Sequence, residues 1–252
     1  MSLDSFFISG RPQPQPLATS QEIRDRGSVF IATIYAASTP AEAAKCIVHL
    51  SKVAHAQKPA SHEMNAFRCM VLKDGRTGLG GPDDFEVREG SADDGERHIL
   101  SERFNNTAAF LAHEIQGERS GGEKILAAMR KQGVIDAAIV VSRWYGGTLL
   151  GPARFSHIET CTLEVCREFK RREEVKDALA ALRSLDDILA QLRDELAVLK
   201  GETASAPVKK PDYSDWIDWD LPKARRLIRA REGSINSVKA LLLKHKQVGM
   251  EQ

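Results

Sequence analysis

The chain has 252 residues, of which 42% are hydrophobic, and its 36 basic and 35 acidic side chains leave a formal charge of +1. That balance excludes a surface built throughout to cover nucleic acid. The longest apolar run, residues 134–141, is too short to cross a bilayer, and four cysteines without a Cys-x-x-Cys pair exclude a disulfide scaffold. We therefore expect a soluble protein of one or two domains, with no membrane partner, located in the cytoplasm or also in the nucleus.

The first elements are expected to form a strand, helix, strand unit. Residues 1–19 include alternating prolines and predict a flexible leader. The run 28–37, SVFIATIYAA, is typical of a β-strand. Residues 39–42 combine a Thr-x-x-Glu capping box with proline at the first helical position, which predicts a helix that ends before Pro59. Residues 63–72 predict the next strand.

An acidic stretch comes next. Residues 83–96 hold seven acidic side chains and one arginine among glycines, which predicts an acidic loop. A second capping box, residues 120–123, predicts a short helix that stops at Gly133. The apolar run 135–142 predicts a buried strand, and a glycine-rich connection then leads into a helix that begins at Pro152.

The following part of the chain is predicted to be helical. The apolar face of the helix ends at Phe169 and restarts at Val175, and this step of six instead of seven predicts two helices without one uninterrupted seam. Leucines at steps of three and four predict a coiled coil over residues 171–200, which either associates with a second copy or folds back. The expected inner face of the first helix consists of Phe155, Ile158, Thr162, Val165 and Phe169.

A linker and a basic tail follow. Residues 201–220 form a linker with an acidic, aromatic end, and residues 221–252 carry eight basic and two acidic side chains on an expected helix. Two arrangements of the tail stay open: the acidic segment folds back on it, or its apolar face docks into a partner groove, which we slightly favour. The docking set comprises Trp216, Trp219, Leu227, Ile228, Ile235, Val238, Leu241 and Leu242.

The glycine-rich connection invites a comparison with phosphate-binding loops. Residues 146–151 have the Gly-x-x-x-x-Gly spacing, but the lysine and hydroxyl residue of a Walker motif do not follow them. Nucleotide hydrolysis by that route is therefore not expected. The glycines serve either a tight turn or an anion or RNA contact made by Arg143 and Arg154, and the sequence leaves both readings open.

Other residue patterns point away from chemistry. Two Cys and His pairs lie at helical spacing, but neither has the second pair that tetrahedral zinc needs, so we expect packing and no metal site. The pairs are Cys46 with His49 and His157 with Cys161. His62 stands beside an acidic residue, yet a polar residue at a strand edge is the commoner explanation than an acid and base pair. Because no nucleophile, base and orienting group can be assembled, we expect no enzyme and no cofactor.

A long motif resembles a known family. Residues 140–158, VVSRWYGGTLLGPARFSHI, strongly resemble the signature of the IMPACT family, whose bacterial relatives include YigZ. Residues 23–32 are similar to the start of the family's domain, residues 60–68 to its second strand and residues 93–96 to its acidic turn. The resemblance covers residues 20–170 as one domain.

The resemblance implies an α+β fold like that of ribosomal protein S5 domain 2, and a regulatory function. Eukaryotic members bind the activator of the stress kinase that phosphorylates initiation factor 2. They carry an N-terminal RWD domain, whereas only a short leader precedes Gln21, so this activator is not carried over as an expected partner. We expect a fungal-like member that acts without catalysis, by binding a protein partner in translational control or the amino-acid starvation response.

The expected binding surface joins the acidic turn to the signature segment, because adjacent groups of opposite charge select a partner by complementarity. An RNA- or ribosome-binding module that uses Arg143, Trp144, Tyr145 and Arg154 is the alternative. The expected surface comprises His62, Asp93, Asp94, Glu96, Arg143, Trp144, Tyr145, Gly146, Gly147, Arg154 and His157.

One departure from the family pattern is an insertion over about residues 96–117. The tripeptide Gly-Glu-Arg occurs at residues 95–97 and again at 117–119, an offset of 22 residues or 66 nucleotides. Removing one block of 22 residues restores the family pattern. We hypothesise a retained in-frame intron, with a genuine surface insertion as the alternative. An intact mass of the native protein that matches all 252 residues would contradict the intron.

Overall fold

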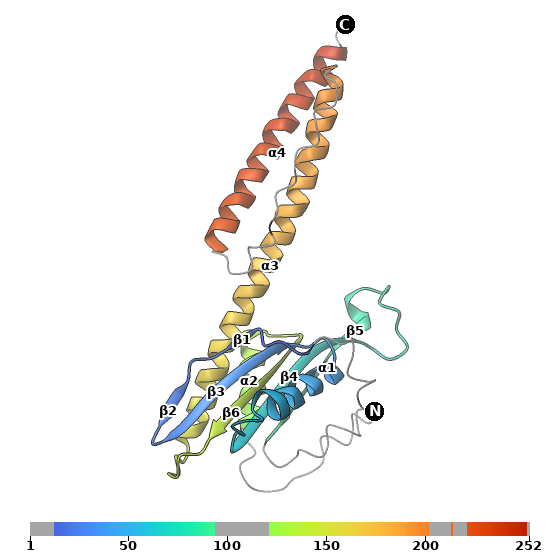
Figure 1. Cartoon of the computed structure of the whole chain (residues 1–252). Helices are drawn as coiled ribbons and strands as arrows, with labels where there is room; N and C mark the ends of the chain where they lie inside the picture. The colour runs from blue at the N-terminus through green and yellow to red at the C-terminus, as the bar shows by residue number, and fades with distance from the viewer. Residues whose placement is uncertain (1–12, 94–120, 202–212, 214–220, 251–252) are drawn as a thin grey trace, which may run out of the picture. The chain divides into compact units, whose positions relative to one another are not determined.

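The computed structural model describes residues 13–93, 121–201, 213 and 221–250, and it divides the chain into two compact units, Met1–Phe169 and Lys170–Gln252 (Figure 1). The strands are β1 (Ala18–Thr19), β2 (Ile23–Asp25), β3 (Ser28–Ala36), β4 (His62–Leu72), β5 (Phe85–Ala92) and β6 (Ala137–Trp144). The helices are α1 (Pro40–His49), α2 (Gly121–Gln132), α3 (Ala153–Leu199) and α4 (Leu221–Met250), with a π-helical segment η2 (Leu50–Ala54) and a 3-10 turn η3 (Pro82–Asp84). Among the described helices, none combines the length and apolarity needed to cross a bilayer.

The first unit is built on one antiparallel sheet in the order β1-β3-β6-β4-β5, with β2 also paired to β3. Strand β6 lies between β3 and β4, and its first seven residues are all buried. A strand covered on both faces needs apolar residues at successive positions, which explains why its sequence is a continuous apolar run. The predicted α+β class is confirmed.

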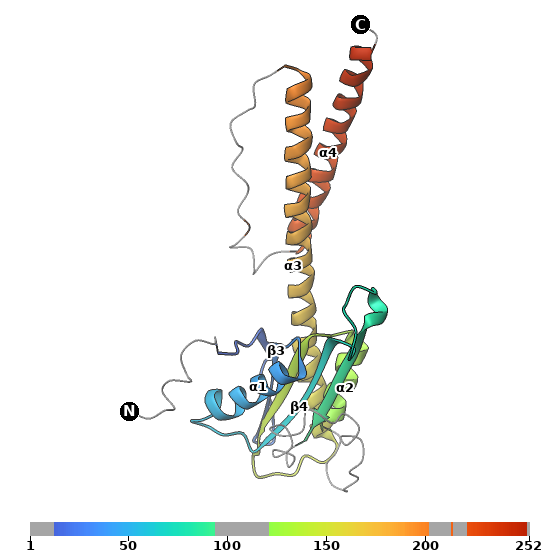
Figure 2. The same ribbon diagram turned by 90° about the vertical axis from the view of Figure 1, so that its right-hand side faces the viewer.

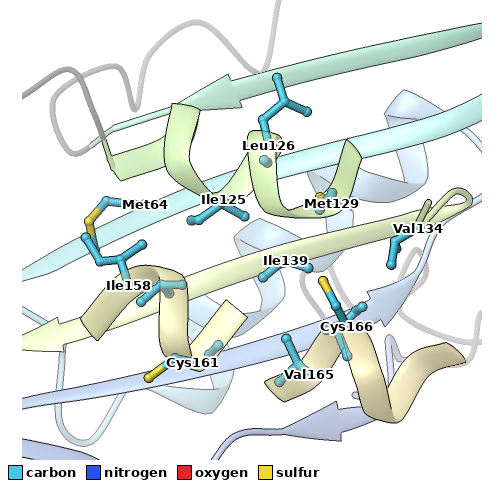
Figure 3. Packing of buried hydrophobic residues seen from close by; sticks show 14 of the residues in the cluster. Met64, Ile125, Leu126, Met129, Val134, Ile139, Ile158, Cys161, Val165 and Cys166 are labelled. Atoms are coloured by element: carbon cyan, nitrogen blue, oxygen red, sulfur yellow. The ribbon is translucent and has the colours of Figure 1, made fainter. Parts of the chain in front are cut away.

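Helices cover both faces of this sheet. Helix α1 lies on one face, and α2 with the first turns of α3 lies on the other (Figure 2). Because side chains alternate along a strand, Ile139 and Val141 contact the α2 and α3 side while Val140 packs with α1. Figure 3 shows Ile125 and Met129 of α2, with Ile158, Cys161 and Val165 of α3, packed over Ile139. Burying each side chain of this size contributes about 1.5–3 kcal/mol.

The start of α1 follows the predicted capping pattern with one difference. The hydroxyl of Thr39 accepts a hydrogen bond from the amide of Glu42 at 3.2 Å, and Pro40 occupies the first turn. The Glu42 carboxylate accepts instead from the amide of Ser38 at 2.9 Å, one residue before the cap. Local sequence therefore fixes this helix end.

Two predictions about the N-terminal half are wrong in part. The leader was expected to extend through residue 19, but the Leu17 amide donates to the Ile34 carbonyl at 2.8 Å and β1 adds an edge strand to β3, because Leu17 and Ala18 have apolar side chains that pack on the core. The acidic loop was expected over residues 83–96, but β5 pairs with β4 along eight residues. Its two acidic side chains, Glu86 and Glu89, have arginine partners, so the strand tolerates them.

The predicted separation of the last helices is also wrong in one respect. Helix α3 runs through residue 170 without a break for 47 residues. The stretch Lys170–Glu174 consists of Lys, Arg and Glu, which are good helix formers. The step of six changes the apolar surroundings and not the helix itself: Phe169 belongs to the core of the first unit, and Val175 to a cluster of the second.

In the second unit, α4 lies along the distal part of α3 in a parallel orientation (Figures 1 and 2). Glu174 pairs with Arg225 at 3.4 Å and Glu195 with Lys246 at 2.8 Å, so both residue numbers rise together along the pair. The apolar face of α4 packs within the unit, with Ala224, Ile235 and Leu242 buried. This packing departs from the favoured expectation that the tail docks its apolar face into a partner; the acidic segment itself lies mostly outside the described residues.

The predicted insertion lies outside the described residues, as does Ser120 of the second capping box, but the positions that flank it are described. The Asp93 carboxylate accepts a hydrogen bond from the Gly122 amide at 2.6 Å, so the end of β5 meets the start of α2. Asp93 thereby satisfies one of the amides that the first turn of a helix leaves without a partner. Asp93 and Gly122, which lie on either side of residues 94–120, are therefore held next to each other.

Candidate functional site

Arg143 occupies the end of β6, where the predicted site is centred. Its neighbours in the sheet register are Phe30 on β3 and His62 on β4. The guanidinium carbon lies 5.4 Å from the centre of the Phe30 ring and 5.5 Å from that of Tyr145, which places the cation against two aromatic rings. Arg143 is only 6% exposed, so it holds the start of the following loop in place and does not present its charge to solvent.

His157 reaches the same face of the sheet from the beginning of α3. Its Nε2 lies 2.9 Å from the Asp25 carboxylate, and its ring centre lies 5.2 Å from that of Phe30. The hydrogen bond with His157 lowers the pKa of Asp25, with a further contribution from Arg26. Sequence reasoning missed Asp25, which is 132 positions away; the only signal was its place inside the motif that marks the start of the domain.

The glycines after β6 allow two backbones to cross. A Cβ atom on Gly146 would lie 1.9 Å from the carbonyl carbon of Gly27, which no side chain tolerates. The Gly146 amide donates to the Ser28 hydroxyl at 3.2 Å, and Gly147 adopts a positive φ of 86°. The sequence left open whether these glycines serve a tight turn or an anion or RNA contact. At Gly146 the structure supplies a conformational reason, because a side chain there would collide with Gly27.

Trp144 lies on the opposite face of the sheet from Arg143, because consecutive strand residues alternate. Its indole N–H donates to the Lys58 carbonyl at 3.1 Å, and its ring meets His55 edge-on at 5.1 Å. The predicted surface therefore does not hold Arg143 and Trp144 side by side. The amide of Tyr145 donates to the Ser61 hydroxyl at 3.0 Å, so the loop is fastened on this side as well.

His62 does not form the acid and base pair considered from the sequence. The carboxylate of Glu63 is buried and lies 3.2 Å from Nδ1 of His55, whereas His62 lies on the other face beside Arg143. The His55–Glu63 pair was not predicted. It links the end of the α1 and η2 segment to β4 and sits next to Trp144.

The remaining predicted residues fall into three groups. Asp93 caps α2, as described above, while Asp94 and Glu96 lie outside the described residues. Arg154 stacks over the ring of Phe155 at 4.7 Å. The expected pairing of the acidic turn with the signature segment stays a prediction.

Reactive side chains are mostly enclosed. All four cysteines are buried, and burial raises the pKa of Cys69 and of Cys166 to about 12. At that value a thiol is not ionised near neutral pH and is a poor nucleophile. Within the described part of the chain, no group of three or more His, Cys, Asp or Glu side chains is arranged to hold a metal ion.

The exposed part of this site is the loop Tyr145–Leu149, which we call the signature loop. Tyr145 is 43% exposed and Leu149 is 78% exposed. The loop is fastened at its start by Ser28, Ser61 and the Gly27 crossing, and after its end by Arg26, which donates to the Leu150 carbonyl at 3.3 Å. A fastened loop with exposed apolar side chains can bind another molecule with little loss of conformational entropy.

A comparison with protein families identifies a domain that lies within the first unit. The family model described as the Impact N-terminal domain matches residues 26–166. Protein IMPACT-A of Xenopus tropicalis is 46% identical over 57 residues, which is 23% of this chain and 18% of that protein. IMPACT family member YDL177C of Saccharomyces cerevisiae is 38% identical over 52 residues, 21% of this chain and 31% of that protein, and human Protein IMPACT is 39% identical over 69 residues, 27% and 22%.

Two solved structures are also similar. One, titled as the structure of the two-domain translational regulator Yih1, has a TM-score of 0.34 and 26% identity and covers 64% of this chain and 50% of that one. The other, a crystal structure of a hypothetical protein, has a TM-score of 0.39 and 22% identity over 63% and 60%. The matches span less than a third of the length of these curated relatives. Because the family model covers 141 of the 252 residues, including β3 to β6 and the signature loop, the chain belongs to the family of the Impact N-terminal domain.

Proposed function

We propose that this protein is a non-enzymatic regulator in translational control that acts in the cytoplasm by binding a protein partner through the signature loop. Membership of the family supports the regulatory role, because the resemblance links the family to translation, and the matched Yih1 structure is titled as that of a translational regulator. The observation that carries the proposal is the exposed Tyr145 and Leu149 on a fastened backbone. Exposed aromatic and apolar residues on a rigid scaffold are the usual anchors of protein interfaces.

The absence of catalysis is part of the proposal. The imidazoles of His157 and His55 each have a carboxylate partner, and the cysteine thiols are buried. Each of these groups has a structural explanation, so none is needed for a reaction. Regulation by binding is the simpler use of this surface.

The alternative function, RNA or ribosome binding through Arg143 and Arg154, has less support. Phosphate contacts need exposed cationic side chains. Arg143 is 6% exposed between two rings, and Arg154 stacks on Phe155.

The test is a crosslinked pull-down with the full chain and a double variant, Tyr145→Ala with Leu149→Ala, each in nuclease-treated and untreated halves. We expect proteins of the translation machinery in both halves with the wild type. In the nuclease-treated half we expect about 10- to 30-fold less recovery with the double variant, since losing interface anchors of this kind costs about 1.4–2 kcal/mol. Leu79→Ala is the matched control, because Leu79 is 92% exposed and lies outside the loop.

Each outcome decides a different part of the proposal. Equal recovery with the double variant would remove the signature loop as the binding surface. Loss of the partners on nuclease treatment would transfer the function to RNA. If every sample contained only proteins unconnected with translation, the proposed role in translational control would be contradicted.

A further inference from the structure

The charge of the second unit is distributed unevenly between its two helices. Residues 170–199 of α3 carry six basic and seven acidic side chains, a net charge of −1. Helix α4 carries eight basic side chains and one acidic side chain over 221–250, a net charge of +7. A near-neutral chain thus concentrates its positive charge on one helix, and such a concentration attracts a polyanion.

The packing of α4 leaves most of this charge exposed. Arg225, Arg231 and Lys246 pair with carboxylates of α3. Five further basic residues are exposed: Lys223, Arg226, Arg229, Lys239 and Lys244. At about 100° per residue, Arg226, Arg229 and Lys244 lie on the side of α4 away from α3, and Lys223 and Lys239 lie on its flanks. We call these five the α4 basic face. Lys223 and Lys244 are 21 residue steps apart, or about 32 Å at 1.5 Å per step.

The same packing argues against the two other uses of a basic amphipathic helix. A helix that lies in a membrane surface, or in the groove of a partner protein, inserts its apolar face. In α4 that face is covered: Ala224, Ile235 and Leu242 are buried, and Leu227 and Ile228 pack on Val175, Leu179 and Leu182 of α3. Leu241 and Leu243 are exposed, at 46% and 63%, but they lie about 160° apart around the helix and form no continuous apolar stripe. The larger available surface is therefore the basic one.

We infer that the α4 basic face binds the phosphate backbone of RNA. Arginine and lysine contact phosphates along a backbone without reading base sequence, and a helix with exposed charges over three turns or more can contact several phosphates. The choice of RNA among polyanions rests on the proposed function in translation. The binding itself uses α4 and not the signature loop, so the two proposals can fail separately.

The test is fluorescence anisotropy of a labelled RNA hairpin of about 20 base pairs with the purified full chain over a range of salt concentrations, because each phosphate contact adds about 0.9 to the slope of log K against log salt. The variant is Arg226→Ala with Arg229→Ala. Losing two contacts should reduce the slope by about 1.8 and the affinity at 0.1 M salt by up to about 60-fold. Alanine favours helix, so the variant keeps α4.

The matched control is Arg183→Ala with Arg193→Ala, which removes the same charge from exposed positions of α3. We expect this control to bind the hairpin nearly as tightly as the wild type. Equal losses in both double variants would reduce the effect to net charge and overturn the site. Absence of hairpin binding by the wild type would overturn it as well, and so would tighter binding to vesicles with 25% phosphatidylserine than to the hairpin, which would assign α4 to a membrane. None of these results would affect the pull-down through the signature loop.

Discussion

Gly146 shows how one missing side chain positions the signature loop. The Gly27 backbone passes so close that a methyl group at Gly146 has no room. Gly147 differs, because a Cβ atom there would meet nothing within 4 Å and only its positive φ resists substitution. Neighbouring glycines in one motif therefore have different physical roles.

The two substitutions should separate these roles. We expect Gly146→Ala to lower the free energy of unfolding by about 3 kcal/mol, because the backbones must move apart. Gly147→Ala should cost about 1–2 kcal/mol through backbone strain alone. Urea denaturation measures both, and an equal or smaller loss at Gly146 would contradict the close crossing.

Asp136 holds another strained position, with a φ of 57° just before β6. Its carboxylate accepts from the Met70 amide at 2.8 Å, and its carbonyl accepts from the Ala37 amide at 2.9 Å, so it ties β6 to two neighbouring segments. Asp136→Ala should destabilise by about 2 kcal/mol, from the lost hydrogen bond and the poorer left-handed preference. Asp136→Asn keeps an acceptor oxygen and tolerates the conformation, so thermal unfolding should show a smaller loss; equal losses would count against this explanation.

At the scale of elements, Glu89 joins three of them. Its carboxylate accepts hydrogen bonds from Arg130 of α2 and Arg68 of β4, the latter at 2.9 Å. The Arg130 hydrogen bond, followed by that of Arg68, lowers the pKa of Glu89 below 4.5. Arg68 also donates to the Val134 carbonyl at 3.0 Å, next to the end of α2. The charged hydrogen bonds of Glu89 thus hold β5, a strand that the sequence did not predict, to β4 and α2.

The hydrogen bonds of Glu89 with its two arginines make the stability of the fold depend on pH. Since the folded-state pKa of Glu89 lies below its unfolded value, its contribution is complete above about pH 4.5 and is lost as the pH falls through the folded pKa. Glu89→Gln should therefore be less stable than the wild type at pH 7, by about 1 kcal/mol, and the difference should shrink toward zero in acid. Unfolding curves between pH 7 and pH 2 measure it; a constant difference would contradict the linkage.

The meeting of Asp93 with Gly122 makes the segment between them removable. Deleting residues 97–118 leaves five residues to join Asp93 to Gly121, a common length for such a connection. We expect the deletion variant to fold, and to gain up to about 1.5 kcal/mol because a shorter loop costs less closure entropy. Circular dichroism and urea unfolding test this, with deletion of residues 125–129 of α2 as the control that should not fold. Failure of the first variant to fold would contradict dispensability and weaken the intron hypothesis.

At the scale of the whole molecule, the two units have separate cores. The second includes a polar group: Asp186 accepts hydrogen bonds from Tyr213 and Arg231, each at 2.5 Å, and Tyr213 is 5% exposed. Burial, followed by the hydrogen bond to Asp186, raises the pKa of Tyr213. Such a group fixes how two helices align, since any shift leaves polar atoms without partners.

Asp186→Ala should therefore destabilise the second unit alone. Removing the acceptor leaves Arg231 and Tyr213 unsatisfied, at a cost of about 3 kcal/mol. Hydrogen exchange read by peptide should show faster exchange in α4 and unchanged exchange in β3 and β6. Asp187→Ala, an exposed neighbour, is the control. Equal acceleration in both units would show that they unfold together.

The sequence predicted the family domain better than its site. Strands β3 and β6 and helix α1 were predictable because apolar runs and a helix cap are local signals. Strand β5 was missed because the arginines that balance Glu89 lie on β4 and α2, far from it in the chain. Arg143 and Trp144 were expected on one surface because the motif is continuous, but strand alternation separates them, and the partner of His157 lies far away in the chain.

The parallel alignment of α4 with α3 sets a minimum length for the connection between the two helices. An antiparallel hairpin would need only a short turn, but the chain must here return about 44 Å from the end of α3 to the start of α4. At about 3.4 Å per extended residue that distance takes about 13 residues, and 21 lie between Leu199 and Leu221. Variants of this protein can therefore lose about eight linker residues at most before the helix pair must reverse, whatever the composition of the linker.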